Sequence, residues 1–458
     1  MPTSPTTRAR DREILRLAVP AFLALVSEPL FLLADASIVG HLGTVPLAAL
    51  GIAGAVVQTA VGLCVFLAYG TTASVARRIG AGDVAGAVGQ GLDGIWLAVL
   101  IGIPTTVVGA LLAGPLVRLL GPAPDVAGPA TDYLRLAMLG VTPLLVVLAA
   151  TGILRGLQDT RTPLVVAVAG NLANIGLNLL LVYGLDLGLV GSAVGSDLAQ
   201  AGTAAALLVV VLRSARRYGV SRRPHPDGIG RAAQAGVALV VRTLTLRASL
   251  LVTTYAAARL GSTSVATHQL AMTLWTFLAF ALDAIAIAAQ ALTGRALGAG
   301  ALDETRAVTR RMTGWGLVAG VVTGLLLAAA SPVLGSLFTD DPQVRDALLP
   351  VLLVAAVFQP VAGVVFVLDG VLIGAGDGRY LARGGLVVLA VFAPLALAAP
   401  HLAAPGHRGT GLVWLWGAFG TGFIGARALV LLHRARGSAW LVAGDPAGLA
   451  DRGRPDAA

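Results

Sequence analysis

The sequence predicts an all-α, polytopic membrane protein with twelve transmembrane helices in two homologous six-helix lobes. Three observations carry this prediction: a mean hydropathy of +0.85 with only 12% charged residues, the alternation of arginine between apolar runs, and an internal repeat. Soluble domains carry about a quarter charged residues, so a water-soluble fold is excluded.

The apolar runs between Arg, Gly and Pro positions are each long enough to span a membrane. A hydrocarbon core of about 30 Å needs about 20 residues of helix. The approximate limits are 14–39, 47–76, 91–113, 131–154, 163–183, 190–212, 236–260, 265–294, 312–337, 347–372, 382–401 and 410–433. The first run resembles a signal peptide, but it continues to Val39 without a small-residue cleavage motif. We therefore expect it to be retained as a helix.

Arginine marks one side of the membrane. All 32 basic residues are Arg, and most of them lie in alternate connections between the runs. The opposite connections hold only Arg118, Arg259, Arg345 and Arg408. Positive residues stay cytoplasmic, so both termini are predicted to be inside. The net charge of +9 is spread between apolar segments, which argues against nucleic-acid binding. A Walker A loop requires Lys, so the chain is not expected to use ATP.

An internal repeat defines the two lobes. Arg-Arg-Ile-Gly-Ala-Gly at 77–82 matches Arg-Ala-Leu-Gly-Ala-Gly at 295–300, which defines a 218-residue shift. The tract 154–161 matches 372–379 with the same shift. Repeats of this size indicate duplicated structural units. The predicted parts are an N-terminal lobe 1–212, a cytoplasmic linker 213–235, a C-terminal lobe 236–434 and a cytoplasmic tail 435–458.

Polar residues inside the first lobe predict a cation site. Glu28 and Asp35 are seven residues apart and so share a helix face, about 10 Å apart along the axis. Pro20 removes a backbone donor and favours a bend in this first helix. Asn174 and Asn178 share a face of the fifth helix. Charged groups at membrane depth are costly and therefore mark functional sites. For the two Asn, hydrogen bonding between helices is an equally good interpretation.

The second lobe carries a different polar set. Asp283 and Asp369 are its intramembrane acids, and Arg242 and Arg247 lie in its first helix. Either an Arg neutralises an acid in a buried structural pair, or the acids titrate; both interpretations stay open. Under the 218-residue shift Asp35 maps to Thr253, so the scaffold repeats but its acids do not. We therefore expect the two lobes to have different roles.

The polar groups favour binding of a cation over bond-making chemistry. A buried carboxylate can take up a proton on one side and release it on the other, and nearby Asn, Ser and backbone oxygens could instead hold Na⁺. With Cys64 as the single cysteine, no zinc cluster is expected, and no cofactor or metal is predicted. Asp93 and Asp197 lie near helix starts, where an acid suits the helix dipole, and are expected to be structural.

Four motifs resemble one family. They are Ala-Asp-Ala-Ser-Ile-Val-Gly-His-Leu-Gly at 34–43, Leu-Arg-Gly-Leu-Gln-Asp-Thr-Arg-Thr-Pro at 154–163, Leu-Asp-Ala-Ile-Ala-Ile-Ala-Ala-Gln at 282–290 and Phe-Val-Leu-Asp-Gly-Val-Leu-Ile-Gly-Ala-Gly-Asp at 366–377. Together they resemble the multidrug and toxic compound extrusion (MATE) transporters, in particular the prokaryotic DinF-like branch. The resemblance covers nearly the whole chain.

The resemblance implies a MATE-like fold of two six-helix lobes in a V, and exchange of a cation gradient for export of amphipathic organic cations. It also implies a cation site centred on Asp35, a helix-1 bend at Pro20 and a helix-6 partner at Ser196. The family's Asn-x-x-x-Asp pattern appears here as Asn174 and Asn178, so one expected acid is an amide. The loss of that charge favours H⁺ over Na⁺ as the coupling ion. A monomer in the bacterial cytoplasmic (inner) membrane, with small-molecule substrates, is expected.

Two other function classes compete with this interpretation. A lipid-linked oligosaccharide flippase of the same superfamily would need extra helices or a cationic cavity, for which only Arg242 and Arg247 give a hint. A membrane-embedded enzyme would need a nucleophile and base or a metal set. The sequence contains no His-Glu-x-x-His and no Gly-x-Ser-x-Gly, so an enzyme is not expected.

Overall fold

The structure is a computed structural model that describes residues 7–402 and 408–444, and these ranges are helical with no strand. The helices are α1 (Thr7–Gly40), α2 (Thr44–Leu63), α3 (Phe66–Gly80), α4 (Val84–Leu111), α5 (Ala113–Leu119), α6 (Pro124–Ala137), η1 (Met138–Gly140), α7 (Val141–Gly156), α8 (Arg161–Leu179), η2 (Leu180–Gly184), α9 (Gly188–Arg217), α10 (Pro226–Arg259), α11 (Ser262–Gly298), α12 (Leu302–Phe338), α13 (Pro342–Gly374), α14 (Gly378–Leu402), α15 (Arg408–Ala418), η3 (Phe419–Gly425) and α16 (Ala426–Arg436).

The predicted all-α membrane fold is confirmed. Within the described ranges, twelve helical segments are long and apolar enough to cross a membrane. Some spans are built from two elements. The predicted span 47–76 is α2 followed by α3, with a break at Cys64, and the predicted span 131–154 combines part of α6 with η1 and α7. The breaks arise because Cys64 and the 3₁₀ turn η1 interrupt the α-helical hydrogen-bond pattern.

The 218-residue repeat is visible in the backbone as well as in the sequence. Gly43 precedes α2 with φ 125°, and Gly261 precedes α11 with φ 107°. Gln158 and Gly376, which the same shift relates, both adopt positive φ, at 63° and 74°. Side chains other than Gly rarely adopt this conformation. The two halves therefore have the same backbone conformation at equivalent turns.

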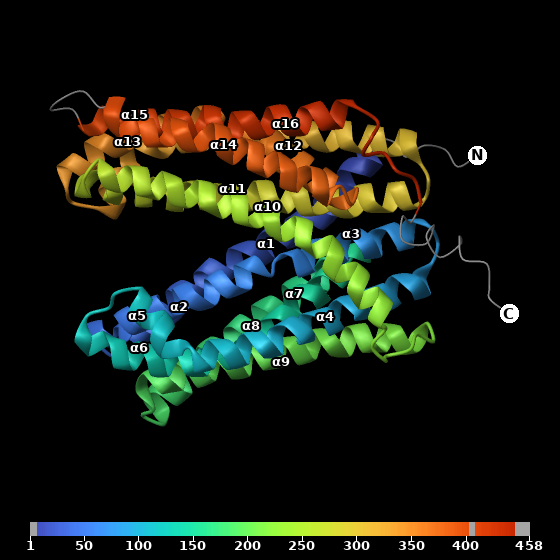
Figure 1. Cartoon of the computed structure of the whole chain (residues 1–458), viewed down its shortest axis with the longest axis horizontal. Helices are drawn as coiled ribbons and strands as arrows, with labels where there is room; N and C mark the ends of the chain where they lie inside the picture. Colours follow the sequence, from blue (N-terminus) through green and yellow to red (C-terminus); the bar gives the residue numbers. More distant parts are fainter. Residues whose placement is uncertain (1–6, 403–407, 445–458) are drawn as a thin grey trace. The chain divides into compact units, whose positions relative to one another are not determined.

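The contacts divide the described chain into two compact units (Figure 1). Unit 1 contains residues 7–18 and 237–444, and unit 2 contains residues 19–236. The boundaries lie inside α1 and α10 and are related by the shift of the repeat, so the first helix of each half contributes to both units. Pro20 lies directly after the first boundary, and α1 is helical without interruption through it. The predicted lobe limits and the bend at Pro20 stay predictions.

The segment predicted as a linker, 213–235, is mostly helical. It contains the end of α9, a connection over 218–225 and the first turns of α10. The predicted tail 435–458 begins at the end of α16, and residues 445–458 lie outside the described part of the chain.

Charged pairs hold the start of α1 in unit 1. The Asp11 carboxylate accepts hydrogen bonds from Arg311 Nε at 2.7 Å and Nη2 at 2.6 Å, and from Trp315 Nε1 at 2.8 Å. Glu13 pairs with Arg295 of α11 at 2.7 Å. The start of α1 is therefore fixed to α11 and α12 by its acids.

The start of α10 lies beside α4 in unit 2, where two charged positions of the repeat have the opposite sign. Asp93 of α4 lies against Gly228, in space that a Cβ at this glycine would occupy. Asp93 and Arg231 line one pocket of about 330 Å³. Under the repeat, Asp93 takes the place of Arg311 and Arg231 the place of Glu13. Asp93 lies in the interior of α4 and not in its first turn, so the predicted role at the start of a helix is wrong.

Small residues bring the helices of unit 1 into close contact. The Cα atoms of Gly316, Gly320 and Gly324 on α12 face backbone carbonyls of α13, and Gly370 and Gly374 on α13 face backbone carbonyls of α11. Glycines at this spacing let helix backbones approach closely in a membrane. Gly370 follows Asp369, so this packing fixes the position of that acid against α11.

Candidate functional site

Asp35 lies in a buried polar group of unit 2. Its side chain is 5% exposed. Asn178 Nδ2 of α8 donates to Asp35 Oδ1 at 2.7 Å, and Ser192 Oγ of α9 donates to the same oxygen at 3.1 Å. No Arg or His pairs with Asp35 within the described residues. Asp35 is therefore an intramembrane acid held by neutral donors alone.

A ladder of hydrogen bonds aligns α8 with α1 around this acid. Asn171 Nδ2 donates to the carbonyl oxygen of Ser27 at 3.2 Å, and Tyr183 of η2 donates to that of Ile38 at 2.6 Å. Asn178 lies between them and contacts Asp35. Successive contacts are about two helical turns or less apart along each helix, so the polar face of α8 lies along the polar face of α1.

Asn174 and Ser196 form a second pair close to the acid. Asn174 Nδ2 donates to Ser196 Oγ at 3.1 Å. The Oδ1 atoms of Asn174 and Asn178 are buried and have no hydrogen-bond partner in the described part of the chain. Buried carbonyl oxygens are normally satisfied, so these two acceptors offer places for a cation or a water molecule.

Two predicted members lie outside the Asp35 group. The Glu28 side chain is exposed and has no hydrogen-bond or ion-pair partner among the described residues. It lies away from the group because a separation of seven residues places it two turns along α1. Pro20 lies nearer the start of α1 and is outside the group as well.

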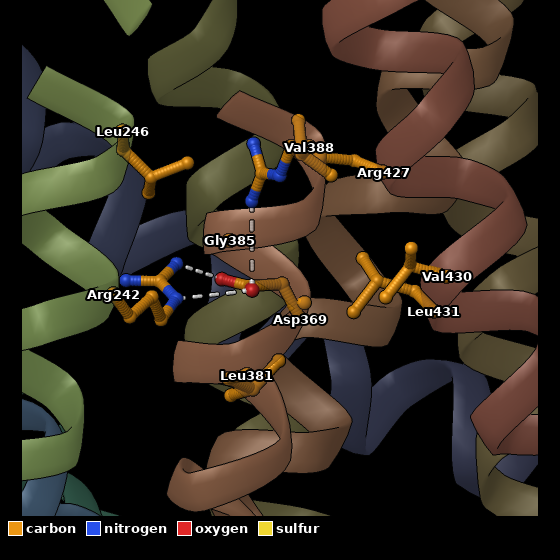
Figure 2. A pocket seen from close by; sticks show the side chains of 10 residues that line it. Arg242, Leu246, Asp369, Leu381, Gly385, Val388, Arg427, Val430 and Leu431 are labelled. Atoms are coloured by element: carbon orange, nitrogen blue, oxygen red, sulfur yellow. Dashed lines mark hydrogen bonds and ion pairs between the residues drawn. The ribbon is translucent and has the colours of Figure 1, made fainter. Parts of the chain in front are cut away.

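Asp369 forms a different kind of group in unit 1 (Figure 2). Arg242 of α10 contacts both of its carboxylate oxygens, with Nε at 3.1 Å from Oδ1. Arg427 of α16 approaches Oδ1 from another side, with Nη2 at 3.5 Å. Asp369 is 7% exposed and each Arg is 9% exposed. The acid thus sits between two buried cations.

The other predicted residues of the second lobe lie outside this pair of contacts. The Arg247 side chain is exposed and pairs with no acid in the described ranges. Asp283 is half-buried in α11 and does not line the cavity beside Asp369. Of the four predicted residues, Arg242 and Asp369 are joined by the contacts described above.

Sequence reasoning missed Ser192 and Arg427. Ser192 is one helical turn before Ser196; Ser192 contacts Asp35 of α1 and Ser196 contacts Asn174 of α8. Arg427 lies inside the predicted span 410–433, and an arginine within a span is itself a signal of function. It follows the π-helical segment η3, which changes the direction of the side chains after it.

Two further polar residues have structural surroundings. Asp197 accepts a backbone hydrogen bond from Gly140 at the end of η1. His268 packs against Trp416 with ring centroids 5.8 Å apart, and its Nε2 is 3.4 Å from Thr254 Oγ1. Both residues join helices within one unit.

Comparison with known proteins agrees with the repeat. The MatE family profile matches residues 20–180 and again 238–397, and the starts of the two matches are related by the shift of the repeat. Each match covers most of one six-helix half.

Relatives match over most of the chain. DNA damage-inducible protein F of Escherichia coli is 30% identical, covering 86% of this chain and 86% of its own length. Protein DETOXIFICATION 45, chloroplastic, of Arabidopsis thaliana is 29% identical over 88% of this chain and 75% of its own. Among solved structures, the bent form of the Vibrio cholerae MATE transporter VcmN has a TM-score of 0.85 at 21% identity, covering 94% of this chain and 97% of that one.

Proposed function

The chain belongs to the MATE family of multidrug efflux transporters, and from this premise we propose that it exports amphipathic organic cations in exchange for protons. Family members are membrane transporters that act on small molecules. The coupling ion, the substrate class and the residues that couple them are our proposal.

The buried Asp35 group carries the proposal. Asp35 contributes one negative charge, while Asn178 and Ser192 contribute neutral hydrogen bonds to the same oxygen. An isolated charge in the membrane interior is costly. One monovalent cation is enough to neutralise this group, and either a proton or an organic cation can supply that charge. Competition between the two for one carboxylate is the chemical basis of exchange.

The amide at Asn178 favours the proton over Na⁺. The family pattern places an acid at this position, and the second negative charge would help to hold a metal ion. Hard cations prefer several oxygen ligands, including carboxylates. Here the site has a single carboxylate with an amide and a hydroxyl. A proton needs only the carboxylate.

Unit 2 also offers features that suit an amphipathic cation. A largely apolar pocket of about 600 Å³ is lined by α2, α4, α5 and η1, and includes Val56, Pro104 and Met138. Pockets of this volume bind drug-sized molecules. Glu28 is an exposed acid within the span of α1, and a charge at this depth faces water or a ligand rather than lipid. The pocket and the acid support an apolar substrate with a positive charge.

The flippase alternative loses part of its support. It relied on Arg242 and Arg247 as a cationic surface for a pyrophosphate. Arg242 is engaged with Asp369 in a buried contact. A single exposed Arg247 is a weak site for two phosphate groups.

We further propose that the transporter works as a monomer without ATP, in a bacterial cytoplasmic membrane with both termini inside. The absence of Lys from the sequence argues against a Walker A loop. The distribution of Arg between the spans supports the orientation.

Efflux in everted vesicles from an efflux-deficient host tests the proposal. Asp35→Asn is expected to insert and fold, but to lose pH-gradient-driven transport of a cationic dye, because an amide cannot exchange a proton. Asp197→Asn is the matched control, since an amide oxygen can still accept the hydrogen bond from Gly140. Collapse of the proton and Na⁺ gradients separately identifies the coupling ion. Undiminished efflux by Asp35→Asn, or efflux that depends on the Na⁺ gradient alone, would contradict the proposal.

A further inference from the structure

A polar pocket of about 330 Å³ lies between α4 and the connection that joins α9 to α10 (Figure 1). All of its lining residues belong to unit 2. Guanidinium groups reach it from three segments: Arg78 at the end of α3, Arg223 in the connection and Arg231 near the start of α10. Asp93 is the acid in this lining. A pocket of this size accepts a small polar ligand.

Two of these arginines are available to a ligand. Arg78 is already engaged, because its Nη1 pairs with Asp83 at 3.0 Å and its Nε donates to Gln90 at 2.7 Å. The guanidinium groups of Arg223 and Arg231 form no hydrogen bond and no ion pair with the described residues. Each guanidinium carries five N–H donors in a planar fork that fits the oxygens of a phosphate group. Both side chains therefore have donors free for an anion.

Asp93 does not compensate both of these charges. Its carboxylate packs on Gly228, and Arg231 lies near enough to offset the charge of this acid. Asp227, in the first turn of α10, is exposed and does not line the pocket. The charge of Arg223 is therefore left without an acid in the lining.

The equivalent place in unit 1 is occupied by close polar contacts. There Asp11 of α1 accepts hydrogen bonds from Arg311 and Trp315. Under the 218-residue shift, Ile229 takes the place of Asp11, and Asp93 takes the place of Arg311. The contacts that hold the start of α1 therefore cannot explain the arginines beside the start of α10.

Two aromatic residues indicate the depth of the pocket in the membrane. Trp96 lies one turn after Asp93 on α4, and its Nε1 donates to the carbonyl oxygen of Arg222 at 3.2 Å. Tyr218 follows the end of α9 and is 43% exposed, with the Cζ of Arg217 5.9 Å from its ring centroid. Trp and Tyr are enriched where the membrane meets water. The pocket therefore lies at the level of lipid headgroups.

An apolar face of α4 continues from the pocket toward the membrane interior. Leu100 and Val107 follow Asp93 at intervals of seven residues and so lie on the same face of the helix. Their side chains are 56% and 50% exposed. An acyl chain can pack along this face, whereas a free phosphate ion would make no contact with it.

We propose that the pocket binds the phosphate group of an anionic phospholipid, with an acyl chain along this face of α4. Arg223 and Arg231 would donate hydrogen bonds to the phosphate oxygens. The segment 213–223 contains five arginines and no acid, and basic clusters next to a span attract anionic headgroups. The proposal goes beyond the exchange assigned to Asp35 and does not depend on it. The orientation proposed above decides only that the lipid comes from the cytoplasmic leaflet.

Short-chain lipids added to the purified full-length protein in detergent test the proposal. The melting temperature is expected to rise in a saturable way with dioctanoyl phosphatidylglycerol. It should rise much less with dioctanoyl phosphatidylcholine, whose headgroup has no net charge, and with glycerophosphate at equal ionic strength, which has no acyl chains. An equal rise with both lipids, or a rise that glycerophosphate reproduces, would overturn the proposal.

Three substitutions separate the pocket from general surface charge. Arg223→Gln and Arg231→Gln are each expected to weaken phosphatidylglycerol binding about fivefold or more, because each removes a positive charge beside the headgroup. Gly89→Leu should also weaken it, with no change of charge, because a side chain there enters the pocket, where its Cβ meets Val220 Cγ1 at an ordinary contact of 3.5 Å. Arg222→Gln is the matched control with unchanged binding, since Arg222 is an exposed neighbour outside the lining.

Arg223 keeps the test decisive if Arg231→Gln does not fold. Arg223 is exposed in a connection, so Arg223→Gln is expected to fold. Equal binding by Arg223→Gln and Arg222→Gln would contradict the proposal, whether both bind as the unmodified protein does or both are weakened. So would unchanged binding by Gly89→Leu.

Discussion

Asp35 in unit 2 and Asp369 in unit 1 are both buried acids within spanning helices, but their partners have different charges. Asp35 accepts hydrogen bonds from Asn178 and Ser192, which are neutral. Asp369 contacts Arg242 and Arg427. The carboxylate between two arginines already has cationic partners, whereas in our proposal the carboxylate among neutral donors takes up a mobile cation. On this proposal, the surroundings of an intramembrane acid, rather than its presence, decide whether it couples transport to an ion gradient.

The duplication makes this difference informative. Both halves share the 218-residue repeat in the sequence and at turns such as Gln158 and Gly376. Each acid also has a π-helical segment nearby, η2 after Asn178 and η3 before Arg427. A common scaffold therefore carries two polar groups with different chemistry, and each prediction below changes one of them.

Removal of Arg242 is expected to have the largest effect on the comparison. Arg242→Met leaves the Asp369 carboxylate buried with Arg427 alone at 3.5 Å. Breaking a buried ion pair costs roughly 3–5 kcal/mol of the free energy of unfolding. The melting temperature in detergent should fall strongly, and the double substitution with Asp369→Asn should not recover the loss, because the buried Arg427 then lacks its acid. Arg247→Met, on an exposed neighbour in α10, is the matched control with little expected change.

If Arg242→Met is as stable as Arg247→Met, the contact between Arg242 and Asp369 does not stabilise the fold, and this prediction is wrong.

Asn178→Asp is expected to convert the Asp35 group from proton toward Na⁺ dependence. The substitution places a second carboxylate within hydrogen-bond distance of the first, where Asn178 Nδ2 is now 2.7 Å from Oδ1. Two adjacent carboxylates cannot both stay charged without a cation between them. Efflux at a fixed proton gradient should therefore become stimulated by Na⁺. The matched control, Asn171→Asp, lies two turns away and contacts the Ser27 carbonyl instead.

Na⁺ stimulation that is the same in both variants would mean that Asn178 does not set ion selectivity. Transport assays in proteoliposomes with controlled gradients measure this difference.

Ser192→Ala is expected to have the smallest effect of the three. It removes one of two donors to Asp35 Oδ1, at a cost of roughly 1.5–3 kcal/mol for a hydrogen bond to a charged group. Proton-driven efflux should fall by about tenfold or more, since the charged form of Asp35 loses a hydrogen bond. Ser196→Ala is the control, because Ser196 contacts Asn174 and not the acid. An equal loss of proton-driven efflux in both variants would mean that the hydrogen bond from Ser192 to Asp35 has no special role.

Much of the fold could be predicted from the sequence because the membrane imposes strong rules. The length of each apolar run and the position of Arg between the runs are visible in the order of residues along the chain, so the twelve spans could be located. The repeat could be found because its turns need particular residues, such as Gly at 43 and 261. Asp35 and Asn178 were identifiable because polar residues in spans are rare.

The partners within each polar group could not be predicted in the same way. Ser192 and Ser196 are one turn apart on α9, and their assignment to Asp35 or Asn174 depends on helix rotation and depth. The approach of Arg427 to Asp369 depends on the π-helical segment η3, which changes the register of the last span. Such details arise from packing between helices that are distant in the sequence. They are not encoded in local periodicity.

Infrared difference spectroscopy of the carboxylic acid C=O stretch tests most directly whether the two acids have different roles. Spectra of the purified protein in lipid, recorded over a range of pH, are expected to show a protonated carboxyl band that appears and disappears reversibly. This band should be absent from Asp35→Asn and unchanged in Asp369→Asn. A pH-dependent band that survives Asp35→Asn and is lost in Asp369→Asn would contradict the assignment of ion coupling to unit 2.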